Sequence, residues 1–142
     1  MANIEPFLGK CLCGGVTYKV SAAPVTSLMC ICTECQTIGG GFGVGSVVAP
    51  QEAVTVETGS DLLQEFQMSG STKGVTRRFC KTCGTHVFAN NPAYPLMAVH
   101  AGTLDDASKF EPKVAIWCQS KRVWHRIPEE VPQFDQYPPP PQ

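Results

Sequence analysis

The sequence has little excess charge of either sign and no long hydrophobic run. Its 142 residues include eleven basic and twelve acidic side chains, which give a net charge of −1. A nucleic-acid-binding domain usually has a clear excess of Lys and Arg, and a membrane helix needs roughly twenty mostly apolar residues. We therefore expect neither nucleic acid nor a membrane as a partner. Residues 1–10 also lack the basic and then apolar pattern of a signal peptide, so we expect a cytoplasmic protein.

Long helices are not expected either, because thirteen glycines and twelve prolines interrupt the chain. Hydrophobic residues make up 43% of the sequence, which suits one domain with a real core. The segment 62–68 fits either a short helix face or a strand, and we interpret it as a strand. Alternating or continuous apolar residues predict strands at 15–20, 25–29, 44–49, 53–57, 62–68, 74–79, 87–89, 96–101 and 114–118.

Cysteine, by contrast, is abundant and clustered. Seven of the eight cysteines lie in three groups with the short spacing of metal ligands, whereas Cys118 is alone. Because a cytoplasmic chain rarely keeps structural disulfides, a disulfide framework is the less favoured interpretation. The three groups are Cys11 and Cys13, then Cys30, Cys32 and Cys35, then Cys80 and Cys83.

The two outer pairs predict one closed zinc site. Zinc takes four ligands in a tetrahedron, and the two thiols of a C-x-C or C-x-x-C turn can both point at one ion. Four thiolates would saturate that ion and join the start of the chain to its middle, so the site would contribute to folding. Gly14 and Gly84 follow the two pairs, and each could supply the positive φ of a tight metal-binding turn.

The central group of Cys30, Cys32 and Cys35 has three thiols and no evident fourth ligand. Three protein ligands and one open position are typical of a catalytic zinc, which can ionise a thiol or water or polarise a carbonyl. Sulfur ligands favour zinc over magnesium, calcium or manganese, while copper(I) or an iron–sulfur cluster remains open. A structural site completed by Cys118 or a histidine is the alternative.

Other features receive plainer interpretations. The glycine-rich stretch 39–45 lacks the phosphate-loop pattern, so we expect it to allow close backbone approach beside the metal site. His86 follows a pair that already completes four ligands, His100 lies on an apolar strand, and His125 follows a tryptophan and is a candidate to line a pocket. We expect packing or hydrogen-bonding roles for these histidines, and a buried apolar role for Cys118.

In combination, these motifs resemble those of the glutathione-dependent formaldehyde-activating enzyme family. The matching residues run from about residue 8 to residue 134, and the later Gly-Thr-Leu-Asp-Asp stretch at 102–106 also looks like that family. The cysteine motifs that carry the resemblance are Gly9-x-Cys11-x-Cys13-Gly14, Cys30-x-Cys32-x-x-Cys35 and Phe79-Cys80-x-x-Cys83-Gly84-Thr85.

The resemblance implies a mostly β, single-domain fold, a zinc-stapled β-tent-like sandwich of short antiparallel strands. The zinc-binding domain covers residues 9–134, and the residues outside it indicate a short arm at 1–8 and a proline-rich tail at 135–142. The resemblance also implies two zinc ions. The structural zinc maps onto Cys11, Cys13, Cys80 and Cys83, and the catalytic zinc maps onto Cys30, Cys32 and Cys35.

The function that the resemblance implies is that of a carbon–sulfur lyase, which adds a small thiol, glutathione first, to formaldehyde. Another aldehyde or an imine is a second hypothesis, and a non-catalytic module that binds a thiol or a protein is a third. Glu34 is close to the open site in sequence, but we expect it to face solvent. Candidates to hold the carboxylates of glutathione are Arg77, Arg78, Lys81, Lys121 and Arg122.

Overall fold

The computed structural model describes residues 5–69 and 74–139, which form one mostly β domain. The expected arm at 1–8 and tail at 135–142 therefore lie partly outside the described residues. No helix in the described ranges has the length and apolar character needed to cross a bilayer. The strands are β1 (Phe7–Lys10), β2 (Thr17–Val20), β3 (Thr26–Cys30), β4 (Val44–Pro50), β5 (Val54–Thr58), β6 (Leu63–Gln67), β7 (Thr76–Cys80), β8 (His86–Asn90), β9 (Leu96–His100) and β10 (Val114–Ile116).

A small antiparallel sheet has the strand order β1-β2-β5. Its first strand was not expected, because Phe7 and Leu8 fall in the segment assigned to the arm. Phe7 pairs with Val20 and Leu8 with Lys19, so the β-structure begins two residues before the expected domain boundary. The pairing buries Phe7, and the burial of this apolar side chain stabilises the additional strand.

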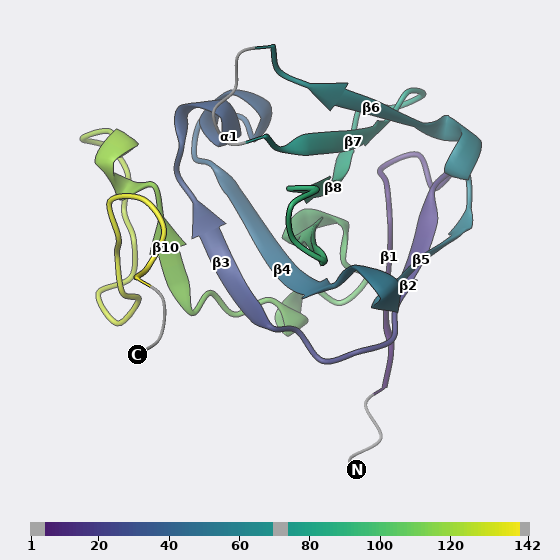
Figure 1. Cartoon of the computed structure of the whole chain (residues 1–142), viewed down its shortest axis with the longest axis horizontal. Coiled ribbons are helices and arrows are strands. Elements are labelled where there is room, and N and C mark those ends of the chain that lie inside the picture. The colour runs from purple at the N-terminus through teal and green to yellow at the C-terminus, as the bar shows by residue number, and fades with distance from the viewer. Residues whose placement is uncertain (1–4, 70–73, 140–142) are drawn as a thin grey trace.

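The larger sheet has seven strands in the order β10-β3-β4-β9-β8-β7-β6 (Figure 1). The segment 62–68, which also fitted a helix, contains the strand β6, as interpreted from the sequence. One pairing differs from the expected antiparallel arrangement, since β10 runs parallel to β3. The helix α1 (Thr33–Ile38) was not expected, and it follows the end of β3 (Figure 1).

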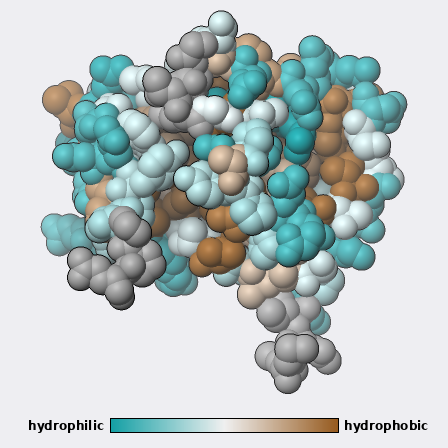
Figure 2. Space-filling view, in the orientation of Figure 1, coloured by the Kyte–Doolittle hydropathy of each residue, from teal (hydrophilic) through white to brown (hydrophobic). Residues whose placement is uncertain are grey.

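The core lies where the inner faces of the two sheets meet. Tyr18 of β2 packs edge-on against Phe88 of β8, with ring centroids 5.1 Å apart. The Tyr18 hydroxyl lies 2.7 Å from the hydroxyl of Thr103, which in turn donates to the carbonyl of His100. On the face of the molecule in Figure 2, hydrophobic residues form several patches separated by polar ones.

The opposite face of the larger sheet carries Cys30, and a bulge in β8 decides which residues of that strand lie on this face. Arg78 pairs with Phe88 but Phe79 pairs with His86, so one extra residue, Val87, is inserted. Val87 and Phe88 consequently both point into the core, where they are buried. His86 is thereby placed on the same face as Ala89, Ala98 and His100.

Candidate metal centres and the adjoining pocket

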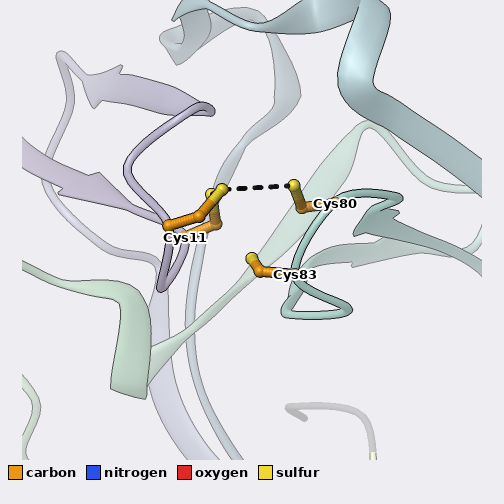
Figure 3. A group of neighbouring side chains, drawn as sticks. Cys11, Cys80 and Cys83 are labelled. Carbon is orange, nitrogen blue, oxygen red and sulfur yellow. Dashed lines mark hydrogen bonds between the residues drawn. The ribbon is translucent and has the colours of Figure 1, made fainter.

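Two turns bring four thiols together. Cys11 and Cys13 lie just after β1, whereas Cys80 ends β7 and Cys83 lies in the turn before β8. Their four Sγ atoms all lie within 4.8 Å of one another. In Figure 3 the labelled Cys11, Cys80 and Cys83 side chains come from these two loops and point toward a common space.

The sulfur spacing in this group fits a tetrahedral metal ion. The Sγ atom of Cys13 lies 3.6 Å from that of Cys11 and 3.9 Å from that of Cys80. Four sulfurs at about 2.3 Å from one zinc ion would be about 3.8 Å apart, whereas bonded sulfurs are about 2.05 Å apart. All eight cysteines are free thiols, so the disulfide interpretation is not supported.

The turns have the conformation expected from the sequence. Gly14 has φ 78° and Gly84 has φ 77°, which confirms that both need the left-handed region. Next to the second turn, the hydroxyl and backbone N–H of Thr85 bond to Cys83 and lower its pKa to about 5. The lowered pKa favours the thiolate of Cys83, the form that binds a metal.

The central three thiols are brought together by the junction of β3 and α1. Cys30 ends β3, Cys32 is the N-cap of α1, and Cys35 lies in the first turn of that helix. The Cys32 Sγ atom accepts a hydrogen bond from the backbone N–H of Cys35 at 3.3 Å. The three sulfurs lie within 4.8 Å of one another, and no other Cys, His, Asp or Glu of the described ranges joins them.

This group also fits a cation on chemical grounds. Contacts with the sulfurs of Cys32 and Cys35, together with burial, raise the pKa of Cys30 far above its ordinary value. Three adjacent thiolates repel one another unless a positive charge lies between them, and a divalent ion displaces their protons. Cys30, Cys32 and Cys35 can therefore hold a soft divalent metal with one position left for a ligand.

The glycine-rich stretch 39–45 wraps around this group, as expected for close backbone approach. Gly43 has φ 132°, and a Cβ atom there would collide with the carbonyl of Cys30. At Gly39 a Cβ would collide with the carbonyl of Gly43. Larger residues at these two positions would push the loop away from the thiols.

An ion pair anchors α1 to β7, which corrects the expectation that Glu34 faces solvent. Arg77 donates from a guanidinium N–H to a carboxylate oxygen of Glu34 at 3.1 Å, with side chains only 5% and 16% exposed. Glu34 lies between Cys32 and Cys35 on the helix. The pair therefore joins the thiol group directly to the larger sheet.

Most of the basic residues suggested for the carboxylates of glutathione have partners of their own. Arg77 is buried against Glu34, Arg78 bonds Glu65 at 3.1 Å, and Lys121 bonds Gln133 at 3.2 Å. Arg122 donates to the side-chain oxygen of Gln36 at 3.1 Å. The exposed Lys81 lies in the turn between the two thiols of the second pair. Arg77 and Arg78, two of the residues suggested to bind these carboxylates, thus form ion pairs within the protein.

His86 and His100 form a stacked pair on the face that carries Cys30. Their ring centroids are 6.1 Å apart and the rings are nearly parallel. Burial, with smaller contributions from His86 and Arg77, lowers the pKa of His100 to about 3. Burial and Arg77 also lower the pKa of His86. His100 is therefore neutral at physiological pH, and the lowered pKa of His86 favours its neutral form as well.

His125 is held by hydrogen bonds to the backbone, and Cys118 lies apart from the thiol groups. His125 is buried, its Nδ1 atom accepts the backbone N–H of Arg122 at 2.9 Å, and its Nε2 atom lies 2.7 Å from the carbonyl of Phe42. An acceptor role for Nδ1 requires the proton on Nε2, which donates to that carbonyl. Cys118 begins a short 3₁₀ turn (Cys118–Ser120) rather than ending β10, and it lies outside both thiol groups. It is only half-buried, which corrects the expectation of a buried residue.

A cavity of about 560 Å³ opens beside the three-thiol group. We call it the Cys30 pocket, because that residue is its contact with the group. Its floor is formed by the same sheet face, through Leu28, Ser46 and Ala98. A second cavity, of about 700 Å³, lies between the glycine-rich stretch and the four-thiol site and includes His86 and His100 in its walls.

Comparison with known proteins agrees with this arrangement. The family model described as "Glutathione-dependent formaldehyde-activating enzyme" matches residues 6–120, which include both thiol groups. The chain belongs to this family. Sequence alone had pointed to the same family through its cysteine motifs, and that prediction is confirmed.

Relatives of this family come from bacteria and fungi. A Halomonas elongata protein is 27% identical over 84% of this chain and 79% of its own length. An Aspergillus oryzae protein is 31% identical over 74% of this chain but only 56% of its own length, so this chain spans little more than half of it. Both are provisionally named glutathione-dependent formaldehyde-activating enzymes. A crystal structure of a Rhodobacter sphaeroides protein shares the fold, with a TM-score of 0.58, 24% identity, and coverage of 69% of this chain and 87% of that one.

Proposed function

We propose that this chain is a zinc-dependent carbon–sulfur lyase that joins the thiol of glutathione to formaldehyde or a related small aldehyde, and also runs the reverse reaction. The observation that supports it most is the three-thiol group, which has no fourth Cys, His or carboxylate ligand within the described residues and borders a pocket. Membership of the family supplies the substrate pair.

The two thiol groups have different roles in this proposal. Cys11, Cys13, Cys80 and Cys83 would hold a structural zinc, because four sulfurs saturate the ion. Cys30, Cys32 and Cys35 would hold the catalytic zinc, which when bound supplies the charge that ionises an incoming thiol at neutral pH. A cytoplasmic location, where thiols are kept reduced, would keep both groups available to zinc.

The reaction balances without a further co-reactant. The sulfur of the thiol forms a bond to the carbonyl carbon, the π electron pair of the carbonyl moves to its oxygen, and the thiol proton ends on that oxygen through water. The chain positions Cys32 and Cys35 through the anchored helix α1, and the glycine-rich stretch keeps bulky side chains away from Cys30. The site therefore combines a fixed thiol group with open space for two reactants.

The test is exchange between formaldehyde and its glutathione adduct, followed by NMR at equilibrium with and without enzyme. Cys32→Ser should reduce exchange to the uncatalysed rate, whereas the matched control Cys118→Ser, outside both groups, should keep it. Zinc content is measured on each sample, with two ions per chain expected for the parent protein. Exchange no faster than buffer in the fully zinc-loaded protein would refute formaldehyde as the substrate and leave another aldehyde, an imine or a binding module.

A further inference from the structure

The Cys30 pocket is much larger than formaldehyde requires. Formaldehyde has two non-hydrogen atoms, whereas a cavity of about 560 Å³ is within the range that holds whole cofactors or drug-sized ligands. We propose that the pocket binds the side chain of the carbonyl substrate, and that this substrate is an aldehyde with an apolar group at least as large as an aromatic ring. This inference rests on the proposed function and adds a substrate class to it.

The pocket is continuous with the thiol group because of strand register. Cys30 and Leu28 lie on the same face of β3, and Leu28 pairs with Ser46 of β4, which pairs with His100 of β9. Ala98 lies two residues before His100 on that face. A carbonyl carbon bound beside Cys30 would therefore extend its substituent along the floor of the pocket, over Leu28 and toward Ala98.

The chemistry of the walls selects an apolar group. Leu28, Val48, Leu96 and Ile116 all line the pocket, and no lining residue in the described part of the chain is charged. Glutathione carries two carboxylates and an ammonium group, and these would lose water here without gaining an opposite charge. The pocket thus suits the carbonyl partner rather than the body of the thiol.

Two aromatic side chains line the pocket and form an edge-to-face pair that a ring can pack against. Trp117 and Tyr137 both line it, with centroids 5.6 Å apart in an edge-to-face arrangement. Trp117 is the one non-glycine residue with positive φ, at 60°, in the described ranges. Such backbone strain in a bulky residue concentrates at ligand sites, where surrounding structure holds it in place.

The experiment compares formaldehyde with phenylacetaldehyde in the glutathione-dependent reaction of the zinc-loaded protein. We expect kcat/KM to be at least tenfold higher for phenylacetaldehyde than for formaldehyde. Ala98→Leu, which fills the floor of the pocket, should lower the ratio of phenylacetaldehyde to formaldehyde activity at least tenfold. The control Ala107→Leu, exposed and outside the pocket, should leave that ratio unchanged.

Binding supplies a readout that does not depend on the metal. The unreactive alcohol 2-phenylethanol is titrated into the Cys32→Ser protein and followed by calorimetry and tryptophan fluorescence. Saturable binding that Ala98→Leu weakens supports the pocket assignment, even if no aldehyde reacts and the lyase proposal fails. Turnover of formaldehyde alone, with no binding of 2-phenylethanol, overturns the inference and leaves the lyase proposal standing.

Discussion

The buried ion pair between Arg77 and Glu34 gives a prediction with a definite magnitude. Changing Glu34 to Ala removes the carboxylate 3.1 Å from a guanidinium whose side chain is only 5% exposed. The remaining charge is then buried without its partner, and Arg77 Nε already has no hydrogen-bond partner among the described residues. Breaking one side of a buried pair typically costs about 3–5 kcal/mol.

The lower part of this range is expected here, because Glu34 is 16% exposed and water can partly replace it. We therefore expect Glu34→Ala to lower the free energy of unfolding by about 3 kcal/mol, measured by urea denaturation. In a chain of this size that corresponds to a fall in Tm of roughly 10 °C. The helix that carries Cys32 and Cys35 should also loosen, so the zinc content should fall from two toward one per chain.

A double variant separates the pair from other effects of the substitution. Replacing both partners, as Glu34→Leu with Arg77→Met, removes the stranded charge and should be closer in stability to the parent than either single change. Glu65→Ala is the matched control, since it breaks the ion pair with Arg78 in which Glu65 is 63% exposed. A Glu34→Ala loss no larger than that of Glu65→Ala would refute the reasoning.

Three further outcomes are expected. Cys80→Ser should give unfolded or metal-free protein, because it opens the four-thiol site that joins two distant segments, whereas unchanged melting would count against a structural metal. His100→Asn should flatten the pH dependence of stability between about pH 6.5 and 3. In this range the unfolded chain binds a proton at residue 100, whereas folded His100, with its pKa lowered to about 3, does not. The stability of the parent protein therefore falls by about 1.4 kcal/mol per pH unit as the pH falls, and the variant should lack this loss. Gly9→Ala should destabilise by about 1–3 kcal/mol, since its Cβ would collide with the Tyr18 ring, while Gly102→Ala, with no atom near its Cβ, should not.

The sequence predicted the strands best where alternation reflects burial. Tyr18 and Val20 alternate with Thr17 and Lys19, and only the first two are buried. The sequence missed β1 because that strand depends on a partner in β2 rather than on its own pattern. Helix α1 was missed for a similar reason. Its six residues are held by the Cys32 cap and by Gln36, which donates to the carbonyls of Ile31 and Ser120.

The thiol groups were predictable because the spacing of their members is local, whereas the surroundings of the three-thiol group depend on register. Alternation from Phe88 alone would place Val87 on the outer face and His86 in the core. The bulge opposite Phe79 reverses both positions, so that His86 stacks on His100 beside the site. Arg77 is likewise buried against Glu34 because it pairs with Ala89 of β8. No feature of the Arg77–Arg78 dipeptide predicts this burial. The residues that shape the site around the thiols therefore come from strand pairing, which one sequence does not specify.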